Sequence, residues 1–317
     1  MNMLDESTII KIFQKRLGNK KFVSEDVEVF NIGKTKIIAK VDTLVQSTDI
    51  PPKMKIRDAA RKSIVACISD FAAKGVNPQY GMISLNLPKS ISRVNINEIA
   101  RGLRKASDEF NITILGGDTN EGKEIVIHVC LFGIIKKIVK RKGAKIGDTI
   151  FVTGPFGYTA AGLEILLGKK KGDKNFVKKA IKTVISPIPK LDFGIKNRSY
   201  FTSSMDSSDG LSTTLNEMAD QSECKFIINN IPTGKDLIKF AKSHKITPNK
   251  LIFHGGEEYE FVFTTSKKFK SAIKKNAVLL KTPIIEIGHV TKGSGVFLEK
   301  NKKLVRLKDL GWHHFRK

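Results

Sequence analysis

The sequence predicts an α/β (α+β) fold in two domains. Strand-like and helix-like hydrophobic patterns alternate along most of the chain, with short turns between them, as in α/β domains. The chain has 317 residues, enough for two ordinary domains that each bury a core. A charged stretch over residues 136–148 is the best candidate for a boundary. We therefore predict an N-terminal domain over 1–137, a linker over 138–147 and a C-terminal domain over 148–317.

The N-terminal half is dominated by one strongly predicted helix over residues 56–74. Its small and apolar residues recur with helical spacing, and Gly75 is a natural C-terminal stop. Asp70 lies in the last turn, where a carboxylate is mildly unfavourable, so we expect a basic side chain or a metal ion beside it. The other predicted elements are a helix over 4–17, strands over 27–30 and 36–41, a strand over 81–87, a helix over 96–110, and strands over 112–115 and 125–135.

The C-terminal half contains a strand–glycine loop–helix unit. The loop, residues 153–157, resembles a phosphate-binding turn but lacks the Gly-Lys-Ser/Thr ending of a P-loop, so it is a weak signal for phosphate. The predicted elements are a strand over 149–152, helices over 159–167 and 174–184, a helix that follows residue 208, a strand over 225–229, a helix over 234–243 and a strand over 261–264.

The net charge is unusually positive. Lys and Arg number 56 and Asp and Glu number 31, which gives +25 at pH 7. Such a charge can indicate a nucleic-acid partner. Here the lysines are dispersed, the short basic runs over 136–145 and 169–174 are predicted to be solvated loops, and no aromatic-rich basic stripe accompanies them. We therefore predict a generally basic surface and no nucleic-acid partner, with a nucleic-acid-binding protein as the alternative.

Nothing in the sequence predicts a membrane partner. No apolar run approaches the roughly 18 residues of a membrane span, and the N-terminus lacks the basic and apolar regions of a signal peptide. The expected location is cytoplasmic. Cys67, Cys130 and Cys224 stand singly, without metal-ligand spacing, and are predicted to be buried reduced thiols.

The rest of the chain is organised around residues 205–211, Met-Asp-Ser-Ser-Asp-Gly-Leu. The pattern predicts a tight turn into a helix, with Ser208 as N-cap, Asp209 in the first turn and Asp206 just before it. A helix N-terminus offers free N–H groups to phosphate, and carboxylates are the ligands that Mg²⁺ prefers. The motif therefore suits a magnesium–nucleotide complex. A capped helix with a spare surface aspartate remains an alternative.

Further aspartates are predicted at strand ends, helix ends or glycine turns, including one behind Gly116 and Gly117. Like charges at close range raise one another's pKa, so these groups can share a site only with cations. Oxygen-only ligands fit Mg²⁺ better than Zn²⁺. The residues alone therefore predict a magnesium-dependent phosphoryl-transfer enzyme. The aspartates concerned are Asp26, Asp42, Asp70, Asp118, Asp206 and Asp209.

At this point the sequence resembles the thiamine-monophosphate kinase family, in the superfamily of aminoimidazole ribonucleotide synthetase. The resemblance runs from about residue 20 to the C-terminus. It implies an N-terminal domain that dimerises through its sheet, a C-terminal α/β domain, and an ATP site in the cleft formed with the partner of a homodimer. The motifs that carry it, in the family's order, are DTLV at 42–45, SDFAAKG at 69–75, GGDT at 116–119, VTG at 152–154 with AGL at 161–163, MDSSDGL at 205–211 and GGEEYE at 255–260.

The resemblance also implies a reaction and a set of site residues. The γ-phosphoryl group of ATP, the co-substrate, is transferred onto the phosphate of thiamine monophosphate, giving thiamine diphosphate and ADP. Several Mg²⁺ ions would be held by Asp26, Asp42, Asp70, Asp118, Asp206 and Asp209, of which Asp118, Asp206 and Asp209 are the catalytic residues. Gly117, Asp118, Arg141 and Ser208 would contact ATP, and Asp49, Glu257 and Trp312 would lie on the thiamine side.

Three positions depart from the family pattern. Val41 replaces a threonine that usually precedes the Asp-Thr pair, Glu25 stands in an altered acidic cluster, and Asp49 occupies the place of a histidine near the substrate. These departures leave one alternative open, another ATP-using kinase or synthetase of the same superfamily that acts on a different phosphorylated substrate.

Overall fold

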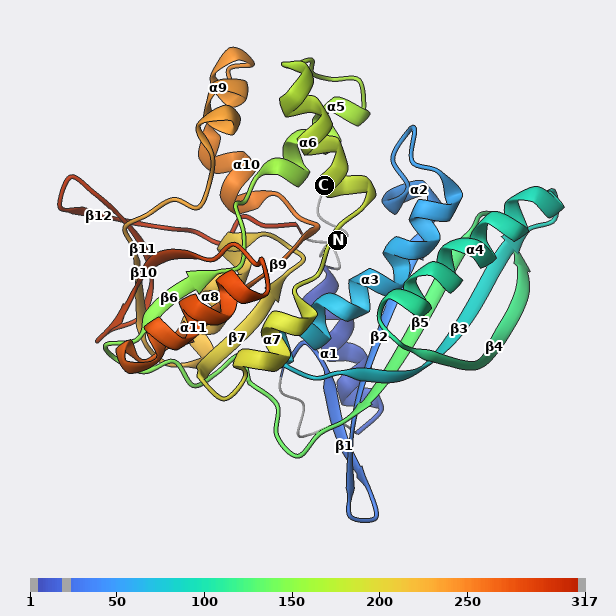
Figure 1. Cartoon of the computed structure of the whole chain (residues 1–317), viewed down its shortest axis with the longest axis horizontal. Coiled ribbons are helices and arrows are strands. Elements are labelled where there is room, and N and C mark those ends of the chain that lie inside the picture. The colour runs from blue at the N-terminus through green and yellow to red at the C-terminus, as the bar shows by residue number, and fades with distance from the viewer. Residues whose placement is uncertain (1–4, 19–23, 313–317) are drawn as a thin grey trace.

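The protein is built from two β-sheets that lie on either side of one long helix (Figure 1). The structure is a computed structural model, and it describes residues 5–18 and 24–312. All strands of the first sheet precede residue 135 in the chain, and all strands of the second follow residue 148. The predicted mixed fold with two sheets is confirmed.

The first sheet has five strands in the order β1-β2-β5-β3-β4. Only β3 and β4 run parallel, and the other neighbours are antiparallel. The strands are β1 (Glu28–Ile32), β2 (Thr35–Val45), β3 (Pro78–Pro88), β4 (Thr113–Gly122) and β5 (Val126–Ile134). The helices of this half are α1 (Glu6–Arg16), α2 (Gln46–Asp49), α3 (Ile56–Lys74) and α4 (Arg93–Glu109).

The second sheet has seven strands in the order β12-β11-β8-β10-β6-β9-β7, so β7 lies at an edge. Its strands are β6 (Thr149–Val152), β7 (Phe201–Ser207), β8 (Lys225–Ile228), β9 (Glu258–Thr265), β10 (Ile285–Thr291), β11 (Gly295–Lys300) and β12 (Lys303–Arg306). The helices around it are α5 (Tyr158–Leu166), α6 (Lys174–Ile185), α7 (Leu191–Asn197), α8 (Leu211–Gln221), α9 (Lys235–Ser243), α10 (Pro248–His254), η1 (Lys267–Phe269) and α11 (Lys270–Leu279).

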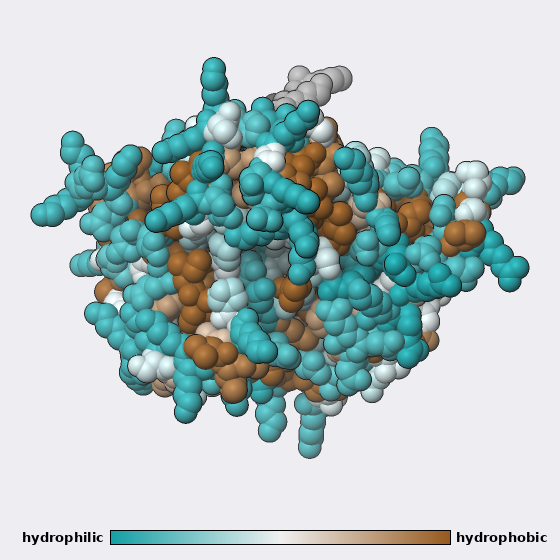
Figure 2. Space-filling view, turned by 45° about the horizontal axis from the view of Figure 1, so that its top comes forward, coloured by the Kyte–Doolittle hydropathy of each residue, from teal (hydrophilic) through white to brown (hydrophobic). Residues whose placement is uncertain are grey.

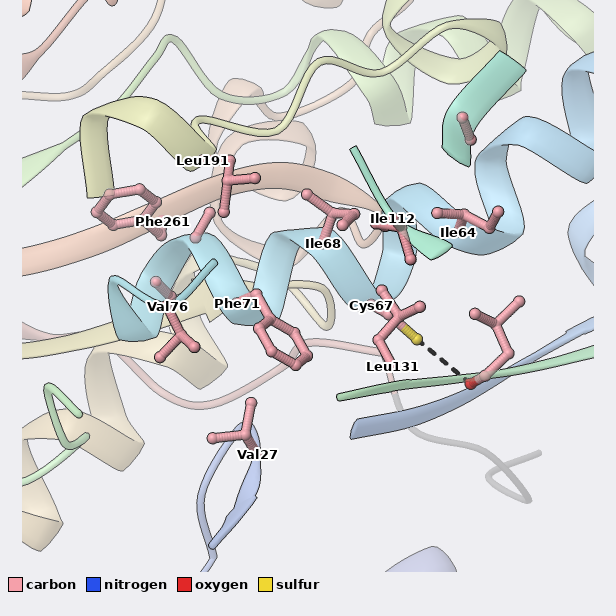
Figure 3. Packing of buried hydrophobic residues seen from close by; sticks show 14 of the residues in the cluster. Val27, Ile64, Cys67, Ile68, Phe71, Val76, Ile112, Leu131, Leu191 and Phe261 are labelled. Carbon is pink, nitrogen blue, oxygen red and sulfur yellow. Dashed lines mark hydrogen bonds between the residues drawn. The ribbon is translucent and has the colours of Figure 1, made fainter. Parts of the chain in front are cut away.

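Helix α3 is buried on nearly all sides because both sheets pack against it. Its apolar side chains meet Leu131 of β5 on one side and Phe261 of β9 on the other (Figure 3). The Cys67 thiol donates a hydrogen bond of 3.4 Å to the Val129 carbonyl oxygen of the first sheet. A helix enclosed in this way is normally apolar all round, so its buried charged residues must have partners.

The predicted helix over 56–74 coincides with α3, and Gly75 ends it in a left-handed conformation with φ 65°. Two predicted strand ends were wrong. Asp42 lies within β2, paired with Val129, and Asp118 lies within β4, paired with Ser84. Gly117 is required by sheet packing, since a Cβ at this position would lie 1.6 Å from the Ile83 carbonyl oxygen. The polar and glycine residues therefore do not interrupt these strands.

The predicted start of the helix after residue 208 was also wrong. Strand β7 extends to Ser207, and α8 begins at Leu211 with Gly210 as its N-cap residue and no side-chain cap. Gly210 has φ 109°, a conformation that other residues rarely adopt. Asp206 therefore lies at the end of a strand, and Ser208 and Asp209 form the bend between strand and helix.

The basic segment after β5 is not simply a solvated loop, which corrects the prediction for residues 136–145. Ile138 and Val139 are buried. The Val139 N–H donates to the Lys74 carbonyl oxygen at 3.3 Å, and the Ser204 N–H donates to that of Lys140 at 2.9 Å. The segment thus threads between α3 and β7, where backbone bonds fix it.

Most of the surface shown in Figure 2 is hydrophilic, with separate apolar patches between the projecting polar side chains. Within the described residues, no helix is long and apolar enough to cross a membrane. Cys67 and Cys224 are buried as predicted, whereas Cys130 is only half-buried, and all three are free thiols.

Candidate active site at the junction of the two sheets

Three buried carboxylates meet where α3 lies between the two sheets. Asp26 precedes β1, Asp70 lies in the last turns of α3, and Asp206 is the penultimate residue of β7. One carboxylate oxygen from each lies within 4.8 Å of the others, and the three residues are only 2%, 3% and 4% exposed. Carboxylates held this close require positive charge between or beside them. We call these three residues the carboxylate cluster.

Asp26 is neutralised by two fixed cations. Lys74 Nζ lies 2.9 Å from Asp26 Oδ2, and Arg141 Nε lies 2.6 Å from Oδ1. Lys74 also bonds to Glu25 and to the Ser204 carbonyl oxygen, both at 2.9 Å. Burial alone would raise the pKa of Asp26, but Lys74 and Arg141 outweigh burial and hold that pKa below its usual range. Asp26 is therefore an ionised member of the cluster.

Asp70 and Asp206 are less well compensated. Burial raises the pKa of Asp206 to about 7, with the charges of Asp26 and Asp209 adding to the effect. Burial also raises the pKa of Asp70 well above its usual value, although Lys40 Nζ lies 3.0 Å from Asp70 Oδ2. Three cations, Lys40, Lys74 and Arg141, thus face three carboxylates, yet burial still disfavours the charged forms of Asp70 and Asp206. A divalent cation bound between these carboxylates would favour their charged forms, and oxygen-only ligands fit Mg²⁺.

Asp42 lies at the margin of the cluster. Lys40 Nζ is 3.8 Å from Asp42 Oδ2, so one lysine links Asp42 to Asp70. Ser207, next to Asp206, is fully buried, and its hydroxyl oxygen has no hydrogen-bond partner among residues 5–18 and 24–312. The strand end that carries Asp206 therefore also presents a hydroxyl group that no described residue satisfies.

Backbone hydrogen bonds join the motifs at 205–211 and 255–260 and the predicted site residue Trp312 into one edge of the site. The Glu257 N–H donates to the Ser208 carbonyl oxygen at 2.6 Å, and the Trp312 N–H donates to that of Asp209 at 2.8 Å. Asp209 is exposed but close enough to raise the pKa of Asp206. The bend after β7 is thereby held between the loop before β9 and the C-terminal segment.

Asp49 lies across the junction from that bend. Its Oδ2 accepts a hydrogen bond of 2.6 Å from the Val45 N–H and so closes the single turn of α2. Lys62 Nζ reaches both the Asp49 carbonyl oxygen, at 3.3 Å, and Glu257 Oε1, at 2.5 Å. Two residues predicted on the thiamine side are therefore joined by one buried lysine.

Asp118 and Gly117 are not brought to the cluster within one chain. They lie on β4, the edge strand farthest from β1. Through the paired residues Ser84 and His128, Asp118 shares a sheet face with Thr43, whereas Asp42 points to the opposite face. Gly117 and Asp118 instead line a groove of about 810 Å³ between β4 and α4.

Three lysines of the site, Lys40, Lys62 and Lys74, were not predicted from the sequence. A signal was present, since Lys62 and Lys74 interrupt the apolar pattern of α3 and Lys40 stands two residues before Asp42 on the same strand face. A lysine in an apolar environment needs a buried acidic partner. Which acid it meets depends on tertiary contacts, so the pairs could not be assigned from the sequence.

The comparisons with known proteins agree along the whole chain. Residues 24–135 match the family described as "AIR synthase related protein, N-terminal domain". The thiamine-monophosphate kinase of Nitrosopumilus maritimus is 66% identical over 100% of both chains. That of Pyrococcus horikoshii is 31% identical over 100% of this chain and 98% of its own.

The solved structures agree with these relatives. The structure "AaThiL complexed with AMPPCP and TMP" matches with a TM-score of 0.87 at 28% identity and covers 99% of this chain and 98% of that one. The identities of 66% and 31% to the two kinases, over nearly the full length of each chain, establish common membership. The chain belongs to the thiamine-monophosphate kinase family.

Proposed function

We propose that the protein transfers the γ-phosphoryl group of ATP onto the phosphate of thiamine monophosphate, which yields thiamine diphosphate and ADP. The observation that carries the proposal is the buried cluster of Asp26, Asp70 and Asp206 in a chain of this family. Phosphoryl transfer depends mainly on positioning and on neutralising charge. Acids and fixed cations gathered at one junction suit both tasks.

We infer that Asp26, Asp70 and Asp206 hold Mg²⁺, with Asp42 and Asp209 beside them. When bound, the metal ions would neutralise phosphate charge and act as Lewis acids. Lys74 and Arg141 keep Asp26 ionised and oriented, and Lys40 pairs with Asp70 and orients its carboxylate. These side chains provide a site that is shaped before the nucleotide arrives.

The thiamine side is proposed to lie between α2 and the loop before β9. Glu257 offers a carboxylate to the aminopyrimidine, and the indole of Trp312, which is 60% exposed, offers an aromatic face to the cationic thiazolium. Lys62 contacts both Asp49 and Glu257. The substrate phosphate would then point toward Asp209 and the cluster.

The nucleotide site is proposed to be completed by a second copy of the chain. The face of the first sheet that carries Asp118 also exposes apolar side chains, namely Val41 at 62%, Tyr80 at 44% and Met82 at 47%. An exposed apolar sheet face of this kind is typical of an interface. Each ATP would be bound by residues of both chains. Gly117 and Asp118 would come from one chain. The carboxylate cluster, Arg141 and Ser208 of the other chain would lie at the phosphates.

We also propose the domain limits 1–137 and 148–317, with 138–147 as the linker. They are supported by the division of the strands, since no strand of either sheet crosses this segment. The linker is packed against α3 and β7, so the domains are expected to move little relative to each other.

The first experiment is turnover with purified protein, ATP, Mg²⁺ and thiamine monophosphate. We expect thiamine diphosphate to form and EDTA to stop its formation. If ATP and Mg²⁺ bind without thiamine diphosphate appearing, the substrate assignment is overturned, and Asp49 is the first position to examine for a different acceptor.

The second experiment tests the shared site by subunit complementation. Asp118→Asn and Asp209→Asn chains are each expected to be inactive as homodimers. Mixed dimers contain one intact site, so co-expression should restore roughly a quarter of wild-type activity. No recovery in mixed dimers would show that Asp118 does not act across the interface.

The oligomeric state is tested directly by light scattering. Met82→Glu places a charge on the exposed face of the first sheet and is expected to shift the protein toward monomer. Val278→Glu, at an 81% exposed position on α11, is the matched control and should leave the dimer intact. A wild-type protein that is monomeric at all concentrations would contradict the dimer.

A further inference from the structure

We propose that Lys62 is a positioning residue for the thiamine side of the site, where it sets the position of the Glu257 carboxylate relative to α2. The inference rests on the proposed function, because it assigns Lys62 a role toward the same substrate. It is carried by the placement of one buried ammonium between two segments that come from different halves of the chain.

The side chain of Lys62 is restricted to one position by burial and by its hydrogen bonds. It lies on α3, the helix enclosed by both sheets, and its side chain is 2% exposed. Its ammonium donates to Glu257 Oε1 at 2.5 Å and to the Asp49 carbonyl oxygen at 3.3 Å. Burying an ammonium without acceptors costs free energy. The hydrogen bonds therefore fix the position of Lys62 and of its two acceptors.

Glu257 needs such support because its backbone is strained. It has φ 59°, a left-handed conformation that a glutamate rarely adopts. Its N–H is fixed by the Ser208 carbonyl oxygen at 2.6 Å, and its carboxylate is fixed by Lys62. Backbone and side chain are thus anchored to different segments, the bend after β7 and helix α3.

The two anchors leave the carboxylate oriented yet accessible. The Glu257 side chain is 30% exposed although one of its oxygens meets a buried lysine. An oriented carboxylate at the rim of the site can accept hydrogen bonds from an aminopyrimidine without first losing side-chain freedom. Lys62 therefore acts on substrate affinity through Glu257, and it makes no contact with the nucleotide groove residues Gly117 and Asp118.

The test is steady-state kinetics of Lys62→Met, which keeps the aliphatic stem and removes the ammonium. We expect the KM for thiamine monophosphate to rise roughly tenfold or more, as for a lost hydrogen bond to a charged group. The KM for ATP should change by less than about twofold, because the lysine lies on the thiamine side. A general loss of structure would instead affect both substrates and kcat together.

A double-mutant cycle with Glu257→Gln isolates the proposed route. If Lys62 acts through Glu257, then Lys62→Met should add little to the KM of the Glu257→Gln protein. Lys62→Arg keeps a cation in place and should recover part of the affinity. Arg61→Met is the matched control, since Arg61 is also buried on α3 but pairs with Glu109 and the Pro187 carbonyl oxygen. It should lower the melting temperature without changing the KM for thiamine monophosphate.

The outcomes separate this inference from the proposed function. A wild-type protein that makes no thiamine diphosphate overturns the proposed function itself. Wild-type turnover, with an unchanged KM for thiamine monophosphate in Lys62→Met, overturns the role of Lys62. If Lys62→Met does not fold, Lys62→Arg in wild-type and Glu257→Gln backgrounds takes its place. Additive effects of these two changes on KM would then overturn the inference.

Discussion

Lys74 Nζ lies 2.9 Å from Asp26 Oδ2, and neither side chain has any exposed surface. The pair joins the end of α3 to the segment before β1, and Arg141 reaches Asp26 from the segment between β5 and β6. A carboxylate and an ammonium so deeply buried depend on each other, because either one alone would be an uncompensated charge. The ion pairs of the acidic site therefore also connect separate segments of the fold.

The first prediction follows from this pair. Lys74→Met should lower the free energy of unfolding by about 3–5 kcal/mol, as for other broken buried ion pairs. It should also raise the pKa of Asp26, because one of its two cations is lost. Urea denaturation followed by circular dichroism measures the stability. Arg104→Met, which breaks the exposed pair with Asp108, should have little measurable effect.

The second prediction concerns Asp209, which is exposed in the bend after β7. Asp209→Asn should reduce kcat by about 10²–10³, the usual cost of a lost electrostatic contact in a transition state. The melting temperature should stay within experimental error of wild type. Asp220→Asn, at an exposed position on α8, is the control. Full activity in the Asp209 variant would remove this residue from the catalytic set.

The third prediction is a pH dependence of stability that comes from Glu258. Burial raises the pKa of Glu258 to about 8, from an ordinary value of 4.5. Between these values the unfolded chain loses the proton while the folded chain keeps it. The contribution of Glu258 to the free energy of unfolding is therefore full below about pH 4.5 and is lost as the pH rises to about 8.

Glu258→Gln should remove this dependence. As the pH rises, the unfolding free energy of the variant should increase relative to that of the wild type by up to about 1.4 kcal/mol per pH unit. Urea denaturation at pH 5, 6, 7 and 8 measures it. A difference that stays constant over this range would show that Glu258 is ionised in the folded protein.

The fourth prediction separates packing from ligand binding at Gly117. Gly117→Ala places a Cβ against the Ile83 carbonyl oxygen and should destabilise the protein by about 1–3 kcal/mol or more, as overpacking does. Gly122→Ala on the same strand meets its nearest atom, Asn86 Cβ, only at 3.3 Å and should cost less. Thermal melts without nucleotide compare the two. Equal melting temperatures would favour a role in phosphate approach alone.

The sequence predicted elements best where local chemistry sets the boundary. The bounds of α3 followed from helical periodicity and from Gly75, which adopts the left-handed conformation expected of a stop. Strands β2 and β4 were predicted too short, because aspartate and glycine, here Asp42 and Gly117, are residue types that often end a strand. Their neighbours in the sheet hold them in register, and no local pattern reveals this.

Several later elements were not predicted from the pattern. Helix α11 leaves Val278 at 81% and Leu279 at 70% exposed, so its apolar residues do not mark a single buried face. Strands β10, β11 and β12 and helices α7 and α10 were also missed. The strands depend on the neighbours that they meet in the second sheet, and the two helices depend on the helices that pack against them.

The sequence predicted which aspartates form the candidate site better than it predicted how they are arranged in space. Asp26, Asp70 and Asp206 come together as the need for shared cations implies, with Asp42 and Asp209 close by. Asp118 lies on the other face of the first sheet, which sequence order cannot reveal. The roles of these residues toward metal, ATP and thiamine monophosphate remain predictions.

The position of α3 between the sheets has a consequence for synthesis of the protein. One hydrophobic cluster contains Ile38 and Val129 of the first sheet together with Phe261 and Phe263 of the second, and α3 lies within it. A nascent chain that has left the ribosome only as far as β5 therefore carries a helix whose second partner surface does not yet exist. The side of α3 that packs against β7 and β9 stays uncovered until those strands are made, so the early half of the chain is expected to bind chaperones until translation is complete.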